Sequence, residues 1–239
     1  MFPLRDSAPS GTYPVVTLSI IVVNAIVWFH ELSLGPDLNE FIFQFGLTPA
    51  RFMASYSLPG GIIGNAVIPM FTSIFLHAGW MHIIGNMWFL WIFGDNVEDR
   101  LGRFNYFVFY ILSGIGASVI QVMAHPGSTI PMVGASGCVS GVLGAYLLSF
   151  PQARIHTLFI FFVIIRFIEV PAFLFLLLWF VFQFISGAAE IGSDHSGGVA
   201  YWAHMGGFVV GMFLLVVMPK KKPRRPWVSN DESIFRRRF

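Results

Sequence analysis

The longest uncharged stretch of this sequence constrains its fold most strongly. No Asp, Glu, Lys or Arg occurs in the 50 residues Phe104–Ala153. One membrane-crossing helix needs about 20 mostly apolar residues to cross about 30 Å of hydrocarbon, so this stretch is long enough for two. Pro and Gly end helices where the backbone reaches water, so the segment His125–Gly127 together with Pro131 marks the break. We therefore predict spans at Phe104–Ala124 and Gly134–Phe150.

The composition supports a polytopic membrane protein with one domain. The chain has 239 residues, of which 56% are hydrophobic and 11% are charged, whereas a soluble domain carries about 25% charged residues. A single cysteine, Cys138, excludes an internal disulfide and a multi-cysteine metal site. We expect no metal, no cofactor and no nucleic-acid partner. The first apolar run comes after only one basic residue, and no small-residue cleavage site follows it. Both features favour a retained span over a removed signal peptide.

Further apolar stretches complete a set of six spans. They are Val15–His30, Gly79–Gly94, Pro171–Ile185 and Tyr201–Met218. The connection Ile155–Phe167 is expected to lie along the membrane surface, because Arg166 and Glu169 would each cost several kcal/mol in mid-bilayer. The loop Leu32–Pro69 is expected to lie outside the membrane and to hold short interfacial helices. The predicted fold is all-α, a bundle of six transmembrane helices.

The charges orient this bundle. We divide the chain into an N-terminal segment 1–14, a six-span core 15–218 and a basic tail 219–239. Six spans place both termini on one side, and twelve of the fourteen Lys and Arg residues fall there. By the positive-inside rule that side is cytoplasmic. The loops around 32–69, 125 and 187–198 then face outward, and we expect a bacterial or archaeal cell membrane.

Polar side chains within the spans are the candidate site, because polar groups are expensive in lipid and are often functional there. Ser136 opens the fourth span, where unpaired backbone N–H groups and the helix dipole favour negative charge. His204 on the sixth span is a candidate general base for a Ser136 nucleophile. His82 and Asn86 share one face of the second span, four residues apart. With the Ser136 amide they are candidate donors to an oxyanion.

This chemistry requires the fourth and sixth spans to approach closely. The sequence favours such an approach, because Gly137-x-x-x-Gly141 and Gly207-x-x-x-Gly211 form small-residue faces. The apolar parts of both spans lack Asp and Glu, so we expect a Ser–His dyad without a third member. Three other residues in or beside the spans are expected to have structural roles and no part in the chemistry. Gln183 is expected to bond a neighbouring backbone, His77 to tie the first loop to the second span, and Cys138 to face away from Ser136.

These motifs resemble those of the rhomboid intramembrane serine proteases. The segment Gly134–Gly137 matches the G-x-S-G nucleophile motif, Ala203–Gly207 matches A-H-x-G-G, and His82–Asn86 matches H-x-x-x-N. The resemblance implies a catalytic Ser136 and His204, supported by Gly134, Gly137 and Gly207. It also implies cleavage of transmembrane or juxtamembrane segments of other membrane proteins. Expected partners are the bilayer and substrates whose transmembrane helices unfold readily, while the natural substrate and oligomeric state stay open.

The sequence departs from the family pattern at one position near the nucleophile, and two other functions are possible. Some rhomboid proteases carry an aromatic residue four places after the nucleophile, packed on the base, and here that position is Ser140. The His204 ring must then be braced in another way. A catalytically silent relative that binds transmembrane helices is one alternative, although such relatives typically lose the Ser or the His. A small transporter with a histidine relay is another, and it predicts an inverted repeat that the sequence does not display.

Overall fold

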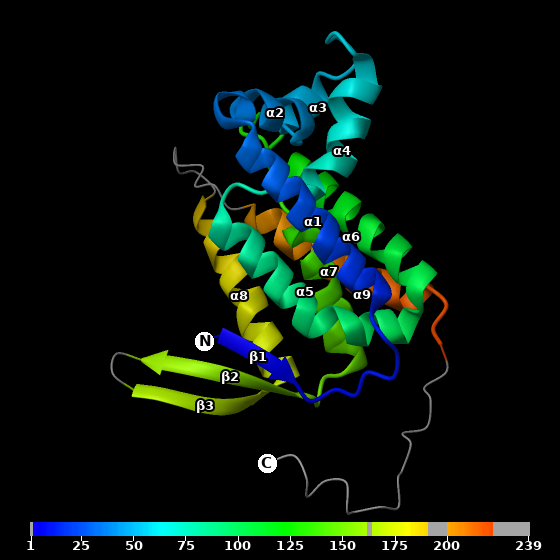
Figure 1. Cartoon of the computed structure of the whole chain (residues 1–239). Coiled ribbons are helices and arrows are strands. Elements are labelled where there is room, and N and C mark those ends of the chain that lie inside the picture. Colours follow the sequence, from blue (N-terminus) through cyan, green and yellow to red (C-terminus); the bar gives the residue numbers. More distant parts are fainter. Residues whose placement is uncertain (1, 162–163, 191–199, 222–239) are drawn as a thin grey trace, which may run out of the picture.

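The computed structural model describes residues 2–161, 164–190 and 200–221 of the chain (Figure 1). The main body of this described part is a bundle of helices that coincide with the six predicted spans. They are α1 (Val15–Ser33), α5 (Trp80–Leu101), α6 (Arg103–Ala124), α7 (Ser136–Ser149), α8 (Ala172–Glu190) and α9 (Tyr201–Val217). The predicted helical membrane fold is confirmed.

The helices differ in their capacity to cross a membrane alone. By length and hydropathy α1, α6 and α8 qualify individually, and α5 qualifies together with Ile63–Phe75, from which it is bent by 78°. With 14 and 17 residues, α7 and α9 are shorter. At 1.5 Å per residue, α7 is about 21 Å long, less than the roughly 30 Å of a hydrocarbon core. Length alone therefore supports up to four spans in the described part of the chain.

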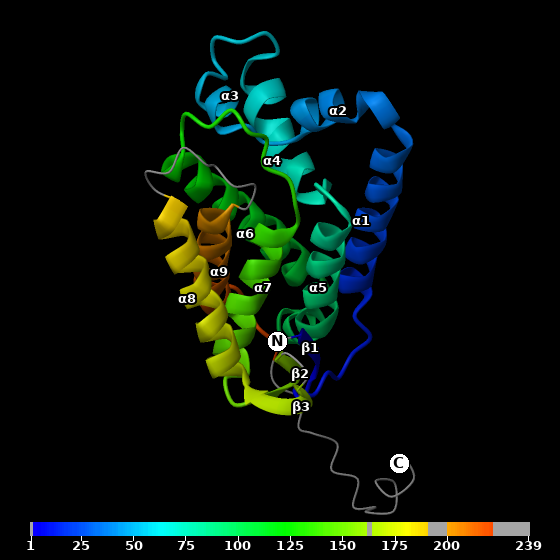
Figure 2. The ribbon, with the colours of Figure 1, turned by 90° about the vertical axis from the view of Figure 1, so that its left-hand side faces the viewer.

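Helix α7 is the centre of the bundle. In Figure 2 it runs between α5 on one side and α8 and α9 on the other. Every residue from Gly137 to Tyr146 is buried, as expected for a helix that is apolar all round. The start of α7 is thus held by neighbours on several sides.

The segment between α1 and α5 caps one end of the bundle with short helical turns. These are η1 (Gly35–Asp37), α2 (Leu38–Phe45), α3 (Pro49–Met53), η2 (Ile63–Val67), α4 (Ile68–Thr72) and η3 (Ser73–Phe75). Arg51 holds this cap together, since its guanidinium donates to Asn65 Oδ1 at 2.7 Å and to the Phe43 carbonyl at 2.6 Å. The backbones of Leu47 and Met132 exchange hydrogen bonds of 3.1 and 2.8 Å. Two loops predicted to face outward therefore meet at one end.

A small antiparallel sheet lies at the opposite end (Figure 1), and the sequence interpretation did not anticipate it. Its order is β1 (Phe2–Asp6), β2 (Arg154–Phe161) and β3 (Ile164–Pro171). The predicted surface connection Ile155–Phe167 thus forms most of a hairpin, and part of the N-terminal segment 1–14 pairs with it. The reason is composition, because the hairpin is rich in the β-branched and aromatic residues that favour strands.

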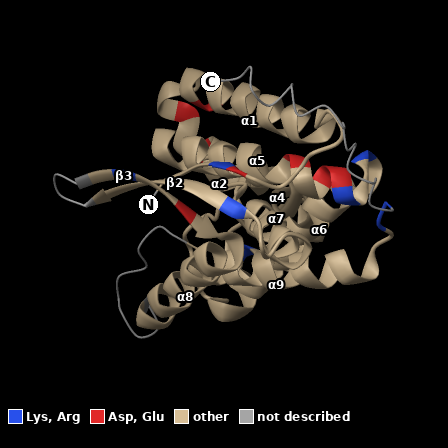
Figure 3. Cartoon of the chain, turned by 90° about the horizontal axis from the view of Figure 1, so that it is seen from below, with Lys and Arg blue, Asp and Glu red and all other residues tan. Residues whose placement is uncertain are grey.

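Charged residues are sparse along the helices and concentrate at their ends and on the sheet (Figure 3). Arg5 and Arg154 lie on strands β1 and β2. At the end of α5, the Lys221 amide donates to the Arg100 carbonyl at 2.9 Å. Residues that the charge pattern assigned to the cytoplasm thus belong to one end of the bundle. The basic tail from residue 222 and most of the predicted loop 187–198 lie outside the described residues.

Candidate active site

Ser136 is the first residue of α7 and is partly exposed. Among the described residues no side chain caps this helix start, so its first N–H groups are available to an anion. Two residues earlier, Gly134 has a φ of +128°, a backbone conformation that L side chains rarely adopt. The Gly134 amide donates to the Ser73 carbonyl at 2.9 Å. A turn that favours glycine and is tied to η3 therefore leads directly into the candidate nucleophile.

His82 and Asn86 converge on this turn from α5. A Cβ placed on Gly134 would lie 2.6 Å from His82 Nε2 and 3.6 Å from Asn86 Nδ2. The Asn86 side chain is 7% exposed, and its Nδ2 is buried without a hydrogen-bond partner among the described residues. Such an unpaired amide is costly in a protein interior. Two side-chain donors of the predicted oxyanion group thus lie beside the backbone that precedes Ser136.

The glycine faces of α7 and α9 bring the two helices into backbone contact. A Cβ added at Gly207 would collide with the backbone of Gly137, and one at Gly211 would collide with that of Gly141. The predicted small-residue packing of the fourth and sixth spans is confirmed. A Cβ on Gly137 would also lie 3.9 Å from the Ala203 carbonyl oxygen. The first turns of α7 and α9, which carry Ser136 and His204, therefore adjoin each other.

The His204 ring is held by α8. Its Nδ1 lies 2.8 Å from Gln183 Oε1, and its ring centroid lies 6.2 Å from that of Trp179. Gln183 was expected to bond a neighbouring backbone, whereas its Oε1 meets the His204 side chain, because α8 turns this buried amide toward α9. The sequence contains a signal for this face, since Trp179, Gln183 and Gly187 recur every four residues and so share one side of a helix.

Ser140, which replaces the aromatic residue, does not support the imidazole. Its hydroxyl donates to the Ser136 carbonyl at 2.7 Å, one turn back in the same helix. Cys138 is fully buried and points at α6, where a Cβ on Gly114 would collide with its sulfur. Cys138 faces α6 in the interior, in agreement with the expectation that it points away from the nucleophile.

Gln121 on α6 is a further residue that the sequence interpretation missed. Its Oε1 accepts a hydrogen bond of 3.0 Å from the Ala203 amide, one of the otherwise unpaired N–H groups in the first turn of α9. Its Nε2 lies 3.4 Å from His125 Nδ1. Gln121 thus fixes the start of the helix that carries His204, beside the loop that follows α6.

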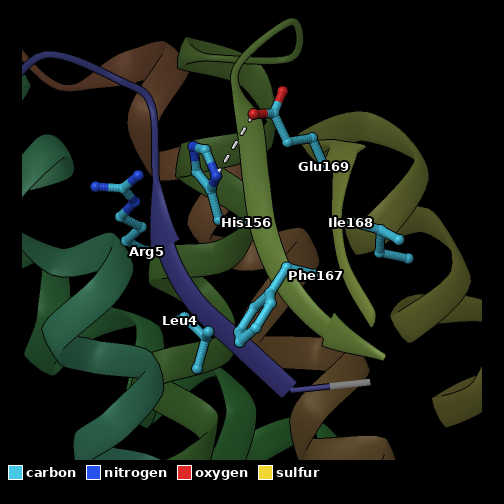
Figure 4. A pocket seen from close by; sticks show the side chains of 6 residues that line it. All are labelled: Leu4, Arg5, His156, Phe167, Ile168 and Glu169. Atoms are coloured by element: carbon cyan, nitrogen blue, oxygen red, sulfur yellow. Dashed lines mark ion pairs between the residues drawn. The ribbon is translucent and has the colours of Figure 1, made fainter. Parts of the chain in front are cut away.

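A small hollow of about 30 Å³ adjoins Ser136, enough for a water molecule. Its walls come from η3, α6, α7 and the residues just before and within α9, among them Ser73, Ser118, Gly134, Ser136, Ala200 and Ala203. A larger hollow of about 370 Å³ lies on the sheet, where His156 Nδ1 is 3.6 Å from Glu169 Oε1 (Figure 4). Its lining contains no residue of the candidate active site.

The comparison with protein families decides the family of this chain. A family described as "Rhomboid domain" matches residues 64–221, which include α5 to α9 with Ser136 and His204. The chain belongs to the rhomboid family. This agrees with the motifs and with the helical membrane fold.

Individual relatives extend the likeness beyond the matched domain. The chain is 28% identical over 223 residues to Rhomboid-like protein 11, chloroplastic, of Arabidopsis thaliana, covering 88% of this chain and 70% of that protein. It is 31% identical to Rhomboid protein 1, mitochondrial, of Saccharomyces cerevisiae, covering 73% and 50%. It is 26% identical to Presenilin-associated rhomboid-like protein, mitochondrial, of Bos taurus, covering 79% and 50%. The chain thus spans half the length of the yeast and bovine relatives.

The match to the rhomboid family and the long apolar helices together identify an integral membrane protein. The relatives named above carry organellar names. They give no support to the expectation of a bacterial or archaeal cell membrane, which stays a prediction.

Proposed function

We propose that this rhomboid is an intramembrane serine endopeptidase that cleaves transmembrane or juxtamembrane segments of other membrane proteins. The observation that carries the proposal is the convergence of His82 and the unpaired Asn86 amide on Gly134, next to Ser136. A buried donor without a partner is what an enzyme needs where negative charge develops only during reaction. The adjoining first turns of α7 and α9 supply the neighbouring base.

The proposed reaction uses Ser136 and His204 as a dyad. The Ser136 oxygen attacks the carbonyl carbon of the scissile peptide while His204 accepts the hydroxyl proton. The Ser136 amide, His82 and Asn86 donate hydrogen bonds to the resulting oxyanion. Collapse of this intermediate breaks the C–N bond, and His204 passes its proton to the leaving amine. Water activated by His204 then hydrolyses the ester and regenerates Ser136.

The short α7 suits this chemistry in lipid. Because α7 falls about 9 Å short of a hydrocarbon core at 1.5 Å per residue, one of its ends must lie within the membrane. We place the Ser136 end there, with the small hollow beside it as the water site. Both termini are proposed to be cytoplasmic, since most basic residues that the structure describes lie toward the sheet end. Substrates are then segments that unwind where they meet this site.

Labelling with a fluorophosphonate, which reacts with activated serine hydroxyls, tests the proposal. The detergent-solubilised protein is compared with the Ser136→Ala and His204→Ala variants after each is shown to be folded. Labelling of the wild type that disappears in both variants is the expected result. A folded wild-type protein that stays unlabelled argues against the enzyme and favours a relative that only binds transmembrane helices.

A further inference from the structure

We propose that Gln183 is a positioning residue that holds His204 in the tautomer with its proton on Nδ1, leaving Nε2 free to act as the base. The inference rests on the proposed function for its catalytic consequence. The contact and the tautomer themselves involve only two side chains, Gln183 on α8 and His204 on α9.

The tautomer follows from the contact between these side chains. His204 Nδ1 lies 2.8 Å from Gln183 Oε1, a normal hydrogen-bond distance. An amide oxygen only accepts hydrogen bonds, so with Gln183 Oε1 facing the ring the proton of this contact is on Nδ1. A neutral imidazole has one N–H, and Nε2 is then the unprotonated nitrogen. Only an unprotonated nitrogen can take the proton of a serine hydroxyl.

The contact belongs to a matched pair of helix faces. Trp179 and Gln183 are one turn apart on α8, and His204 and Phe208 are one turn apart on α9. The Trp179 ring lies 6.2 Å from His204 and 5.9 Å from Phe208, between centroids. At the next turn, a Cβ on Gly187 would lie 3.1 Å from Tyr201 Cβ. Three successive turns of α8 therefore set the height and rotation at which Gln183 meets the imidazole.

Gln183 takes the place of two groups that support the histidine base in other serine proteases. A carboxylate is the partner of the base in Ser–His–Asp triads, and α7, α8 up to Ala189 and α9 contain no Asp or Glu. An aromatic residue four places after the nucleophile is replaced by Ser140, whose hydroxyl bonds its own helix. Gln183 is 7% exposed, so water competes little for its oxygen. The amide orients the base without adding a charge in the membrane, where charges are expensive.

Two substitutions separate this role from packing. Gln183→Met keeps the length of the side chain and removes the acceptor, whereas Gln183→Glu keeps an acceptor oxygen at the same distance. We expect Gln183→Met to lower kcat by roughly 10- to 100-fold, less than the 10² to 10⁴ that the general base as a whole contributes, with KM nearly unchanged. Gln183→Glu should restore most of kcat. Phe184→Met is the matched control, since it introduces the same side chain at the next position of α8, which is exposed.

Nitrogen NMR of ¹⁵N-histidine-labelled protein reads the tautomer directly. His204→Ala identifies the His204 signals by difference, in mildly alkaline detergent solution where the imidazole is neutral. We expect a protonated Nδ1 in the wild type and a shift of protonation toward Nε2 in Gln183→Met. A wild-type ring protonated on Nε2 overturns the inference, as does a Gln183→Met variant with unchanged tautomer and kcat. Loss of fluorophosphonate labelling in every form, with Nδ1 still protonated, would refute the proposed protease and leave the positioning role standing.

Discussion

Gly207 on α9 lies directly against the backbone of Gly137 on α7, and no space is left between them for a Cβ. We expect Gly207→Ala to lower the free energy of unfolding by about 1–3 kcal/mol, the usual cost of overpacking. It should also reduce fluorophosphonate labelling, because it separates the helices that carry Ser136 and His204. Thermal unfolding in detergent and the labelling assay measure the two effects.

A glycine with free space around it supplies the control. Gly85 lies inside α5, and beyond the backbone of its own helix no described atom lies within 4 Å of an added Cβ. Gly85→Ala should therefore keep or raise stability, by up to about 1 kcal/mol from helix propensity. Equal losses in Gly85→Ala and Gly207→Ala would show that helical glycines matter here for a reason other than close packing.

The donors beside Gly134 should act on turnover more than on binding. We expect Asn86→Ala to lower kcat about 10²- to 10³-fold, the usual effect of removing one oxyanion donor, with a smaller change in KM. His82→Ala should act in the same direction. Steady-state kinetics on a membrane-embedded substrate measures both values. A double variant of His82 and Asn86 that cleaves at the wild-type rate would falsify their role.

Glu98 should stabilise the start of α1 from a neighbouring helix. This α5 side chain is 1% exposed and accepts hydrogen bonds from the Val16 amide at 3.0 Å and the Thr17 amide at 2.8 Å. Glu98→Ala leaves these donors unpaired, so we expect a loss of about 2–3 kcal/mol in unfolding free energy. Asp99→Ala is the control, since Asp99 accepts hydrogen bonds from the exposed Gly11 amide at 3.2 Å and from the Thr12 hydroxyl at 2.7 Å. These groups are less buried than Glu98, so each bond should contribute about 1 kcal/mol or less. Similar losses at both positions would contradict the capping role.

Asp6 should make the stability depend on pH. Burial raises the pKa of its carboxyl above the ordinary value of 3.8, although the hydrogen bond donated by the Tyr146 hydroxyl opposes this. The folded state therefore keeps the proton to a higher pH than the unfolded chain does. The free energy of unfolding then falls as the pH rises from 3.8 through the folded-state pKa.

Asp6→Asn removes this titration. We expect the unfolding temperature of the variant to depend less on pH than that of the wild type in the range from pH 3.8 upward, through the raised folded-state pKa of Asp6. Parallel curves for the two proteins across that range would show that another group carries the dependence. Because the asparagine side chain still offers an oxygen to the Tyr146 hydroxyl, the hydrogen bond itself is largely preserved.

The positions of the long helices could be predicted from the sequence, because they depend on residues that are close together along the chain. The six predicted spans coincide with helices, since the length and hydropathy of an apolar run depend only on consecutive residues. The contact of Gly137 with Gly207 was also predictable, because small residues four apart mark a face on which backbones approach. The motif around Ser136 identified the family for the same reason.

The partners of individual side chains were decided by tertiary structure. Strand β1 pairs with β2 although some 150 residues separate them, and no local pattern announces a pairing of that range. Gln183 meets His204 only because α8 packs on α9 with one particular face. If α8 were rotated about its own axis, the amide would point away from His204. The sequence by itself determined which segments form the long helices and which residues are the candidates for the chemistry. Packing decided which faces meet, because that depends on all the helices at once.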